Sequence, residues 1–246
     1  MSFVVGIDGP AGSGKGTVTK IIANKLGLTN IDTGITYRCV ALQVLNKGIN
    51  LNEKEKIIEI ANNINISINN TKDGDIVYLE GKDVTNQIRS KEVTSIVSQV
   101  SSINEVRFAM VELQRKLAEG KNVIMEGRDI CTYVFPNADV KIYLEASLEK
   151  RTKRRYREMQ EKGINITLEE VKNNIEMRDK NDKAKEIGAL KLAPDSIVVD
   201  TTNKTIDEVV QEIINIIKSN RRILVSWSEK WEVRSENLER CLRNII

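Results

Sequence analysis

The sequence contains no histidine among its 246 residues. This absence removes the commonest general base and the commonest metal ligand of proteins. Any chemistry must therefore use carboxylates, lysine, arginine, backbone amides or a bound ion. Cysteine is also scarce, since Cys39, Cys131 and Cys241 are scattered and form no CxxC pair. Their number and spacing argue against a zinc site and a disulfide framework, and we expect an intracellular, cytoplasmic protein.

Long apolar runs and a strong charge imbalance are missing as well. No run is long enough to cross a bilayer, and the N-terminus lacks a signal-peptide pattern, so we expect no membrane association. The formal net charge of +3 is too small to indicate nucleic-acid binding by itself. The length suits one sizeable soluble domain, with or without inserts.

Apolar runs alternate with helical patterns along most of the chain. Four continuous runs predict buried strands of a parallel sheet that is covered on both faces: FVVGI, NVIME, VKIYLEA and SIVVD. Helical patterns such as Thr17–Leu26 and Thr36–Leu45 separate the strands. This alternation predicts an α/β, doubly wound fold.

One region, about residues 60–99, interrupts the alternation. NISI, the turn-rich NNTKDGD and IVYLEGKDV predict a small antiparallel sheet with hairpin turns. A long helix, roughly Val93 to Leu117, is expected to follow. We interpret this region as an insert in the main sheet and not as a second independent domain.

The segment GIDGPAGSGKGT, from Gly6 to Thr17, joins the first strand to the first helix. Glycines let backbone N–H groups converge on phosphate oxygens, and the helix N-terminus adds a positive potential. Lys15 completes the pattern G-x-x-x-x-G-K that begins at Gly9, and the hydroxyl of Thr17 follows one residue later than usual because Gly16 intervenes. The loop is therefore predicted to hold a nucleoside triphosphate.

Further motifs indicate which P-loop protein this is. After GSGKGT come DTGITYR, SQVSSINEVR, EGRDICTYVFPNADVKIYLEAS and MRDKNDKAK. In this order, over approximately residues 2 to 218, the chain resembles the bacterial cytidylate kinases, a family of nucleoside monophosphate kinases. The resemblance implies Mg²⁺-dependent transfer of the γ-phosphate of ATP to CMP or dCMP, giving CDP or dCDP and ADP in pyrimidine metabolism. It also implies a P-loop NTPase-type sheet with a monophosphate-binding insert and a short lid.

Site residues are predicted on both sides of the reaction. The loop pattern assigns ATP to Gly9, Gly12, Gly14, Lys15, Gly16 and Thr17. Thr17 is expected to hold Mg²⁺ directly, and Glu126, after a buried strand, through water. The resemblance assigns CMP to Thr33, Tyr37, Arg38, Ser98, Arg107, Arg128, Asp129, Arg178, Asp182 and Lys185. Lys15, Arg128, Asp129, Arg154 and Arg155 are the predicted catalytic residues.

The basic run KRTKRRYR, from Lys150 to Arg157, is interpreted as part of a mobile lid over about residues 150–166. Lids exclude water and complete a charge clamp, and Arg151, Arg154 and Arg155 are its candidates for the triphosphate. Three positions depart from the family pattern. Glu126 stands where Asp is commoner, Cys131 where Gly is commoner, and Lys185 where Arg is expected. Lysine keeps the charge but loses the bidentate fork.

Residues 1–220 are expected to form the kinase domain, in a monomer. Residues 221–246 extend past the resemblance and predict an amphipathic helix of unknown role, which packs on the core, pairs with another chain or binds a partner. Two other functions stay open. One is a P-loop kinase for UMP or AMP. The other is a nucleotide-dependent RNA-binding protein that uses the Lys150–Arg157 run, with steep salt dependence and no turnover of free CMP.

Overall fold

The computed structural model describes residues 2–71, 74–161 and 163–220. Five parallel strands form the main sheet in the order β2-β6-β1-β7-β8. Their bounds are β1 Val4–Asp8, β2 Thr29–Asp32, β6 Val123–Gly127, β7 Val140–Glu145 and β8 Ile197–Asp200. The predicted α/β fold is confirmed. Since all strands run in one direction, their carboxyl ends share one edge of the sheet, where ligands of open α/β sheets bind.

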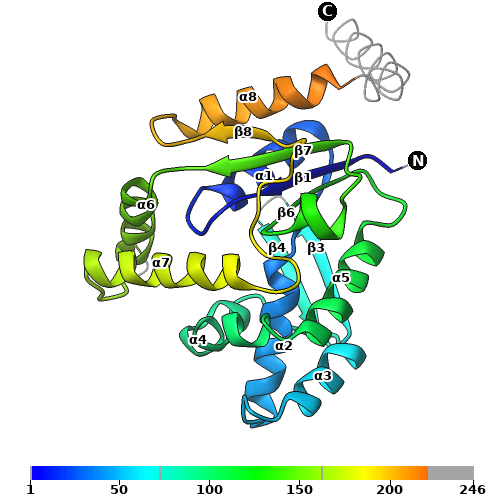
Figure 1. Ribbon diagram of the computed structural model, residues 1–246. Helices are drawn as coiled ribbons and strands as arrows, with labels where there is room; N and C mark the ends of the chain where they lie inside the picture. The colour runs from blue at the N-terminus through cyan, green and yellow to red at the C-terminus, as the bar shows by residue number, and fades with distance from the viewer. Residues whose placement is uncertain (1, 72–73, 162, 221–246) are drawn as a thin grey trace, which may run out of the picture.

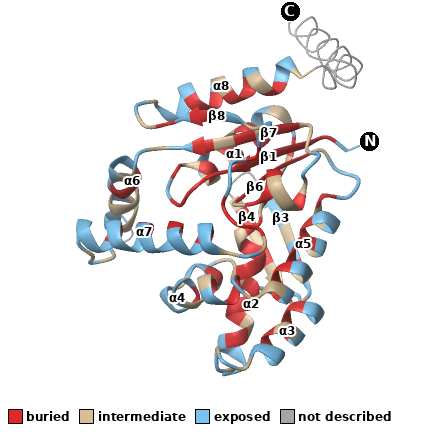
Figure 2. Ribbon diagram, in the orientation of Figure 1, coloured by how far each residue is buried: buried red, intermediate tan, exposed pale blue. Residues whose placement is uncertain are grey.

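Helices cover both faces of this sheet (Figure 1). On one face α1 (Lys15–Leu26) and α8 (Ile206–Ser219) pack on apolar residues of the central strands. On the other face lie α5 (Asn104–Ala118) and the short π-helical turn η2 (Ile130–Val134). The central strands β1 and β6 are buried along their whole length, as Figure 2 shows, which explains why their sequences are continuously apolar instead of alternating.

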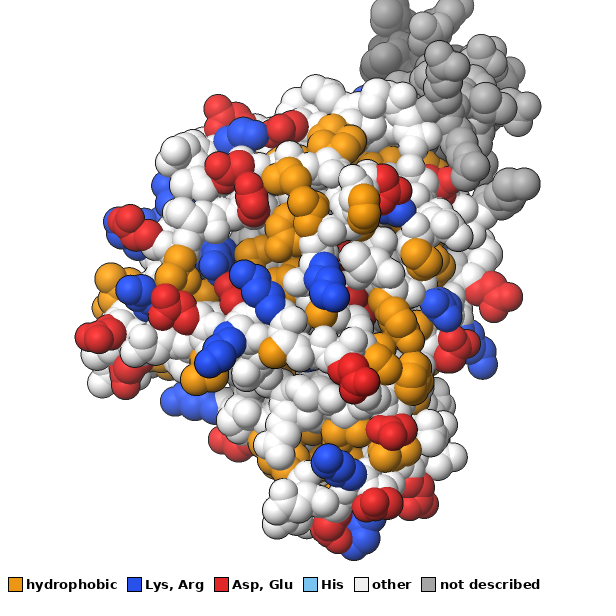
Figure 3. Space-filling view, viewed as in Figure 1, with side chains coloured by type: hydrophobic (Ala, Val, Ile, Leu, Met, Phe, Trp, Pro, Cys, Tyr) orange, Lys and Arg blue, Asp and Glu red, His pale blue; other side chains and the backbone are white. Residues whose placement is uncertain are grey.

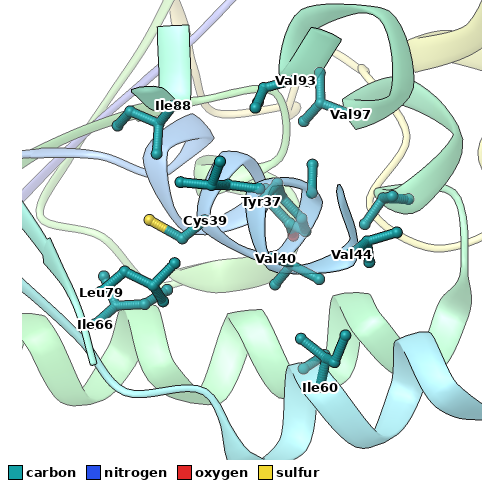
Figure 4. Packing of buried hydrophobic residues seen from close by; sticks show 14 of the residues in the cluster. Tyr37, Cys39, Val40, Val44, Ile60, Ile66, Leu79, Ile88, Val93 and Val97 are labelled. Carbon is teal, nitrogen blue, oxygen red and sulfur yellow. The ribbon is translucent and has the colours of Figure 1, made fainter. Parts of the chain in front are cut away.

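A second apolar cluster lies beside the sheet and is built from residues between Ile35 and Met110 (Figure 4). It joins α2 (Gly34–Asn46), α3 (Lys54–Asn63), α4 (Lys91–Val100) and α5 to a small antiparallel sheet. That sheet has the order β3-β4-β5, with β3 Ile66–Thr71, β4 Gly74–Leu79 and β5 Lys82–Asp83, and a 3₁₀ turn, η1 (Gln87–Arg89), follows it. The predicted antiparallel unit is therefore present, and its apolar core extends beyond residues 60–99.

The predicted long helix between Val93 and Leu117 is wrong in one respect, because it is two helices. The helix α4 ends at Val100 and α5 begins at Asn104. Between them the hydroxyls of Ser101 and Ser102 donate hydrogen bonds to the Ser98 carbonyl, with O–O distances of 3.1 and 2.7 Å. Serine side chains that bond to nearby backbone compete with the helical ladder. After the break, Arg107 in the first turn of α5 contacts Asp129, which follows β6.

Two helices, α6 (Leu148–Glu161) and α7 (Leu168–Ala184), stand at the carboxyl edge and pack on each other. Thr167 and Glu170 form a reciprocal capping box that fixes the start of α7. In the described part of the chain no helix is both long and apolar enough to span a membrane. The amphipathic helix predicted within residues 221–246 lies outside the described residues.

Candidate active site

The loop between β1 and α1 has the backbone that its glycines predict. Gly14 has φ +95° and caps α1, which begins at Lys15. Gly9 has φ +151°, and a Cβ there would lie 2.1 Å from the Leu144 carbonyl oxygen of β7. Side chains are excluded from both positions, so the loop can pass close to the sheet and direct the N-terminus of α1 at a ligand.

Lys15 lies inside this loop, where its Nζ donates hydrogen bonds to the carbonyls of Gly9 and Pro10, at 2.7 and 2.9 Å. Burial lowers the pKa of Lys15, and the nearby positive charges of Arg128 and Arg178 lower it further. A buried ammonium that is held by two loop carbonyls and the Ser13 hydroxyl is ready to exchange those contacts for phosphate oxygens.

Glu126, on β6, is buried next to the start of α1. Its Oε1 accepts a weak hydrogen bond from the Thr19 hydroxyl at 3.4 Å, and the same oxygen lies 3.0 Å from the position of a Cβ on Gly16. Burial raises the pKa of Glu126, and the neighbouring carboxylate of Asp32 raises it further. Thr17 is exposed in the first turn of α1. The carboxylates of Glu126 and Asp32 and the Thr17 hydroxyl provide hard oxygen donors at this edge.

Asp8 is a site residue that the sequence reasoning missed. It ends β1, and its two oxygens accept hydrogen bonds from the backbone N–H groups of Ile130 and Cys131, each at 2.8 Å. Burial raises the pKa of Asp8 to about 6. The carboxylate therefore ties the π-helical turn η2 to the strand that leads into the donor loop. A carboxylate directly after a buried strand was the signal that could have found it.

Cys131 stands where Gly is commoner in the family, but its φ is not positive. Among the described non-glycine residues only Glu80 has a positive φ, of 49°. The thiol of Cys131 instead fills space above Gly6, since a Cβ on Gly6 would lie 2.8 Å from the Cys131 sulfur. Cysteine at position 131 therefore causes no strain of the backbone.

The acceptor side contains a buried ion pair. Arg107 Nη2 lies 2.5 Å from Asp129 Oδ2, and the two side chains are only 2% and 6% exposed. The Arg107 guanidinium also stacks 5.2 Å from the centre of the Tyr37 ring and donates to the Ser101 carbonyl. Thr33 lies nearby, and its hydroxyl donates to the Glu126 carbonyl at 2.8 Å. Cations stacked on aromatic rings and paired carboxylates suit recognition of a polar base.

A second charged group joins β6 to α7. Asp182 Oδ2 lies 2.8 Å from Arg128 Nε, and its Oδ1 lies 2.9 Å from Lys185 Nζ. Although burial opposes ionisation, Arg128 and Lys185 lower the pKa of Asp182 to about 2. Lys185 also donates to the Ser101 hydroxyl at 3.2 Å, and the Ser98 hydroxyl lies 3.5 Å from Asn181 of α7.

Four arginines from different elements face one region: Arg38, Arg128, Arg155 and Arg178. Surrounding protein atoms and the charges of Arg128, Arg38 and Arg155 lower the pKa of Arg178 to about 10. Figure 3 shows lysine and arginine side chains across the middle of the face that carries α6 and α7. Such mutual repulsion is relieved by an anion, so the region suits a phosphate.

The other two arginines of the predicted lid, Arg154 and Arg151, are bonded to neighbouring segments of the chain. Arg154 donates to the hydroxyl and carbonyl of Thr201, at 2.9 and 2.6 Å. Arg151 is buried in an ion pair with Asp179 of α7, with 2.6 Å between Nη1 and Oδ2. Asp179 is a second residue that the sequence reasoning missed, because its partners lie far away along the chain.

The parallel sheet, the phosphate-binding loop and the cationic region beside it define a P-loop phosphotransferase. The family model described as "Cytidylate kinase" matches residues 5–219. A cytidylate kinase of Limosilactobacillus reuteri is 48% identical over 218 residues, which cover 88% of this chain and 96% of the relative. One of Caldicellulosiruptor saccharolyticus is 47% identical over 212 residues, or 86% and 94% of the two chains. The chain belongs to the cytidylate kinase family.

Phosphorylation of CMP or dCMP with ATP is the activity of this family, and the activity predicted from the sequence is confirmed at that level. Among solved structures, an uncharacterized protein from Eubacterium ventriosum matches with a TM-score of 0.50 and 14% identity, covering 89% of this chain and 99% of that one. This likeness concerns the fold alone.

Proposed function

We propose that this chain transfers the γ-phosphate of ATP to CMP or dCMP between the donor loop and the four arginines at the carboxyl edge of the sheet. The supporting observation is electrostatic. Arg128 and Arg178 lie close enough to Lys15 to lower its pKa, so the cations of the donor and acceptor sides share one small region. Phosphoryl transfer depends mainly on such positioning and charge neutralisation, and a protein without histidine can perform it.

On the donor side, backbone N–H groups of the loop from Gly9 to Gly16 hold the phosphates. Lys15 exchanges its bonds to the Gly9 and Pro10 carbonyls for bonds to β- and γ-phosphate oxygens. Its charge then follows the transferring group. Because the bond from the Ala11 N–H to Asp179 holds the loop on α7, binding requires little reorganisation of the backbone, which is favourable for catalysis.

Mg²⁺ fits the residues at the start of α1. The described residues hold no cluster of three or more carboxylate or cysteine ligands. Mg²⁺ with a nucleotide requires none, because phosphates and waters complete its shell around one or two protein oxygens. Thr17 would hold the ion directly and Glu126 through water, and the ion would neutralise charge on the triphosphate. Its presence would also favour the ionised form of Glu126, which burial disfavours.

On the acceptor side, Arg38, Arg128 and Arg178 hold the phosphate of CMP. Of these, Arg38 is oriented by its bonds to the Ile88 carbonyl and the Thr94 hydroxyl, both at 3.0 Å. Seven further residues are assigned to CMP: Thr33, Tyr37, Ser98, Arg107, Asp129, Asp182 and Lys185.

The lid, about residues 150–166, closes over the phosphates through Arg154 and Arg155. Arg155 already faces the acceptor arginines, while Arg154 would have to release Thr201. Arg151 reaches the donor side through Ala11, to whose carbonyl it donates at 2.9 Å. Residues 1–220 act as one kinase domain in a monomer.

A panel of acceptors tests this proposal. ADP release is measured with ATP–Mg²⁺ and CMP, dCMP, UMP or AMP, and the cytidine nucleotides should give the highest kcat/KM. Faster turnover of UMP or AMP would contradict the acceptor assignment. Binding to RNA that falls steeply with salt, without turnover of CMP, would favour the RNA-binding alternative.

A further inference from the structure

Asp179 lies at a buried contact between three segments that the reaction needs. Its Oδ1 accepts a hydrogen bond from the backbone N–H of Ala11 in the donor loop, at 3.0 Å. Its Oδ2 accepts from Arg151 Nη1, at the start of α6, at 2.6 Å. The two side chains are 9% and 11% exposed. One carboxylate of α7 therefore joins the donor loop to the base of the lid.

Arg151 completes this contact on the other side of Ala11. It donates to the Ala11 carbonyl at 2.9 Å and to the Ala146 carbonyl at 3.0 Å. A Cβ on Gly12 would lie 3.3 Å from the Cβ of Arg151, so α6 packs directly on the loop. Both backbone polar groups of Ala11 are thus bound by the Arg151–Asp179 pair, which fixes this part of the loop.

The helix α7 is held at two points, three residues apart. Asp179 binds the donor loop, and Asp182 binds Arg128 at the end of β6. Arg178 directly precedes Asp179 in the chain. Its guanidinium forms no hydrogen bond to the described residues. Because a helix is rigid over one turn, the contact between Asp179 and Ala11 sets where Arg178 stands relative to Lys15.

We propose that Asp179, acting with Arg151, is a positioning residue that sets the spacing between the loop that holds ATP and the helix that holds CMP. This inference rests on the proposed function. Phosphoryl transfer tolerates little misplacement of the reacting groups, so losing this contact lowers kcat more than it weakens the binding of either nucleotide. Arg151 then acts through Ala11, whereas the sequence predicts that it contacts ATP directly.

The test compares Asp179→Asn, Arg151→Lys and the double variant with wild type. A matched control is Glu149→Gln, which removes an exposed ion pair with Lys153 on the same helix α6. Each single variant should lower kcat about 10²-fold, the cost expected for a misplacement of about 1 Å. KM for ATP and for CMP should stay within about threefold. The double variant should be no worse than either single one, since both single changes disrupt the same ion pair.

The kcat is expressed per nucleotide-binding site, counted by titration, so that unfolded protein does not contribute. Variants that melt at lower temperature but keep the wild-type kcat would overturn the proposal, since the pair would then be only structural. A weaker binary affinity for ATP in Arg151→Lys, but not in Asp179→Asn, would also overturn it, in favour of direct contact. If Asp179→Asn does not fold, Arg151→Lys decides alone: a wild-type kcat, or a binary affinity for ATP clearly weaker than that of wild type and Glu149→Gln, overturns the proposal. Failure of wild type and Glu149→Gln to phosphorylate CMP would instead show that the proposed function is wrong.

Discussion

Gly16 and Glu126 meet at the start of α1, where a Cβ on Gly16 would lie 3.0 Å from a carboxylate oxygen of Glu126. The commoner loop has Ser or Thr directly after the lysine. Here a side chain at that position would press against the tip of a buried carboxylate. The hydroxyl stands one residue later, at Thr17, where the side chain is exposed.

Glu126→Gln should raise the Mg²⁺ concentration that gives the half-maximal rate by about 10-fold or more, the usual cost of losing an outer ligand of a metal. The amide is neutral and orients metal-bound water less strongly. Initial rates are measured against free Mg²⁺ at fixed ATP. Glu112→Gln, on the exposed side of α5, is the control. An unchanged Mg²⁺ dependence would remove Glu126 from the metal site.

Lys15→Ala should lower kcat about 10²-fold or more, the order of losing one preorganised electrostatic contact. The ammonium is the donor-loop cation that follows the transferring phosphate. Steady-state kinetics measure the effect, with Lys25→Ala at the exposed end of α1 as the control. Near-normal kcat in folded Lys15→Ala would show that the donor loop is wrongly assigned.

Arg38→Lys and Arg178→Lys should each lower kcat as well as raise KM for CMP, because lysine cannot bond two phosphate oxygens as arginine does. Lys185→Arg should leave kcat unchanged or lower KM for CMP, because arginine keeps the positive charge and adds the bidentate fork. The wild-type lysine is bonded to Asp182 and to the Ser101 hydroxyl. Kinetics at saturating ATP–Mg²⁺ and melting curves are run together. If both lysine variants fold and keep wild-type kinetics, neither arginine holds the acceptor phosphate.

Gly188→Ala should weaken the binding of CMP and leave the binding of ATP nearly unaffected. Gly188 has φ +63°, and a Cβ there would lie 2.1 Å from Asp129 Oδ2 and 2.3 Å from Arg107 Nη2. The added methyl group separates the ion pair, and we expect KM for CMP to rise about 10-fold or more, which corresponds to about 1.4 kcal/mol.

The matched control is Gly120→Ala, because Gly120 has a similar φ of +70° but nothing within 4 Å of a Cβ. It separates backbone strain from the contact with the ion pair. Equal values of KM for CMP in the two variants would mean that the Arg107–Asp129 pair does not recognise CMP.

The stability of the nucleotide-free protein should depend on pH through Asp8. Its pKa is raised from 3.8 to about 6 in the folded protein, so the folded state binds this proton more tightly than the unfolded state. The stabilisation by protonated Asp8 is complete below its unfolded pKa of 3.8 and is lost as the pH rises through its folded pKa of about 6. It amounts to about 3 kcal/mol at most, at 1.36 kcal/mol per pKa unit.

Urea unfolding between pH 4 and 7 measures this free energy in wild type and in Asp8→Asn. The wild-type free energy of unfolding should fall relative to that of the variant as the pH rises. Parallel curves would show that Asp8 does not titrate in this range.

Much of the fold could be predicted from the sequence because its signals are local. Continuous apolar runs marked β1, β6, β7 and β8, and the glycine spacing marked the donor loop. The break at Ser101 and Ser102 was not visible, since the apolar pattern continues through it and hydroxyl bonds to the Ser98 carbonyl make the break.

The missed site residues have distant partners. Asp179 binds Ala11 across 168 positions and Asp8 binds Ile130 across 122, and no local pattern records such pairs. Arg151 was interpreted from its basic neighbours as a lid residue that contacts the triphosphate. Its burial follows from the ion pair with Asp179, which only the packing of α6 on α7 and the loop creates.

The contact between Gly6 and Cys131 limits the order in which this chain could change. A side chain on Gly6 would lie 2.8 Å from the Cys131 sulfur and 3.1 Å from a methyl group of Ile130. Removing the thiol alone leaves a small void, whereas adding a methyl group at Gly6 first produces a collision in the centre of the sheet. A mutational path that moves side-chain volume from η2 to β1 must therefore change position 131 first, and the reverse order leads through a poorly folded intermediate sequence.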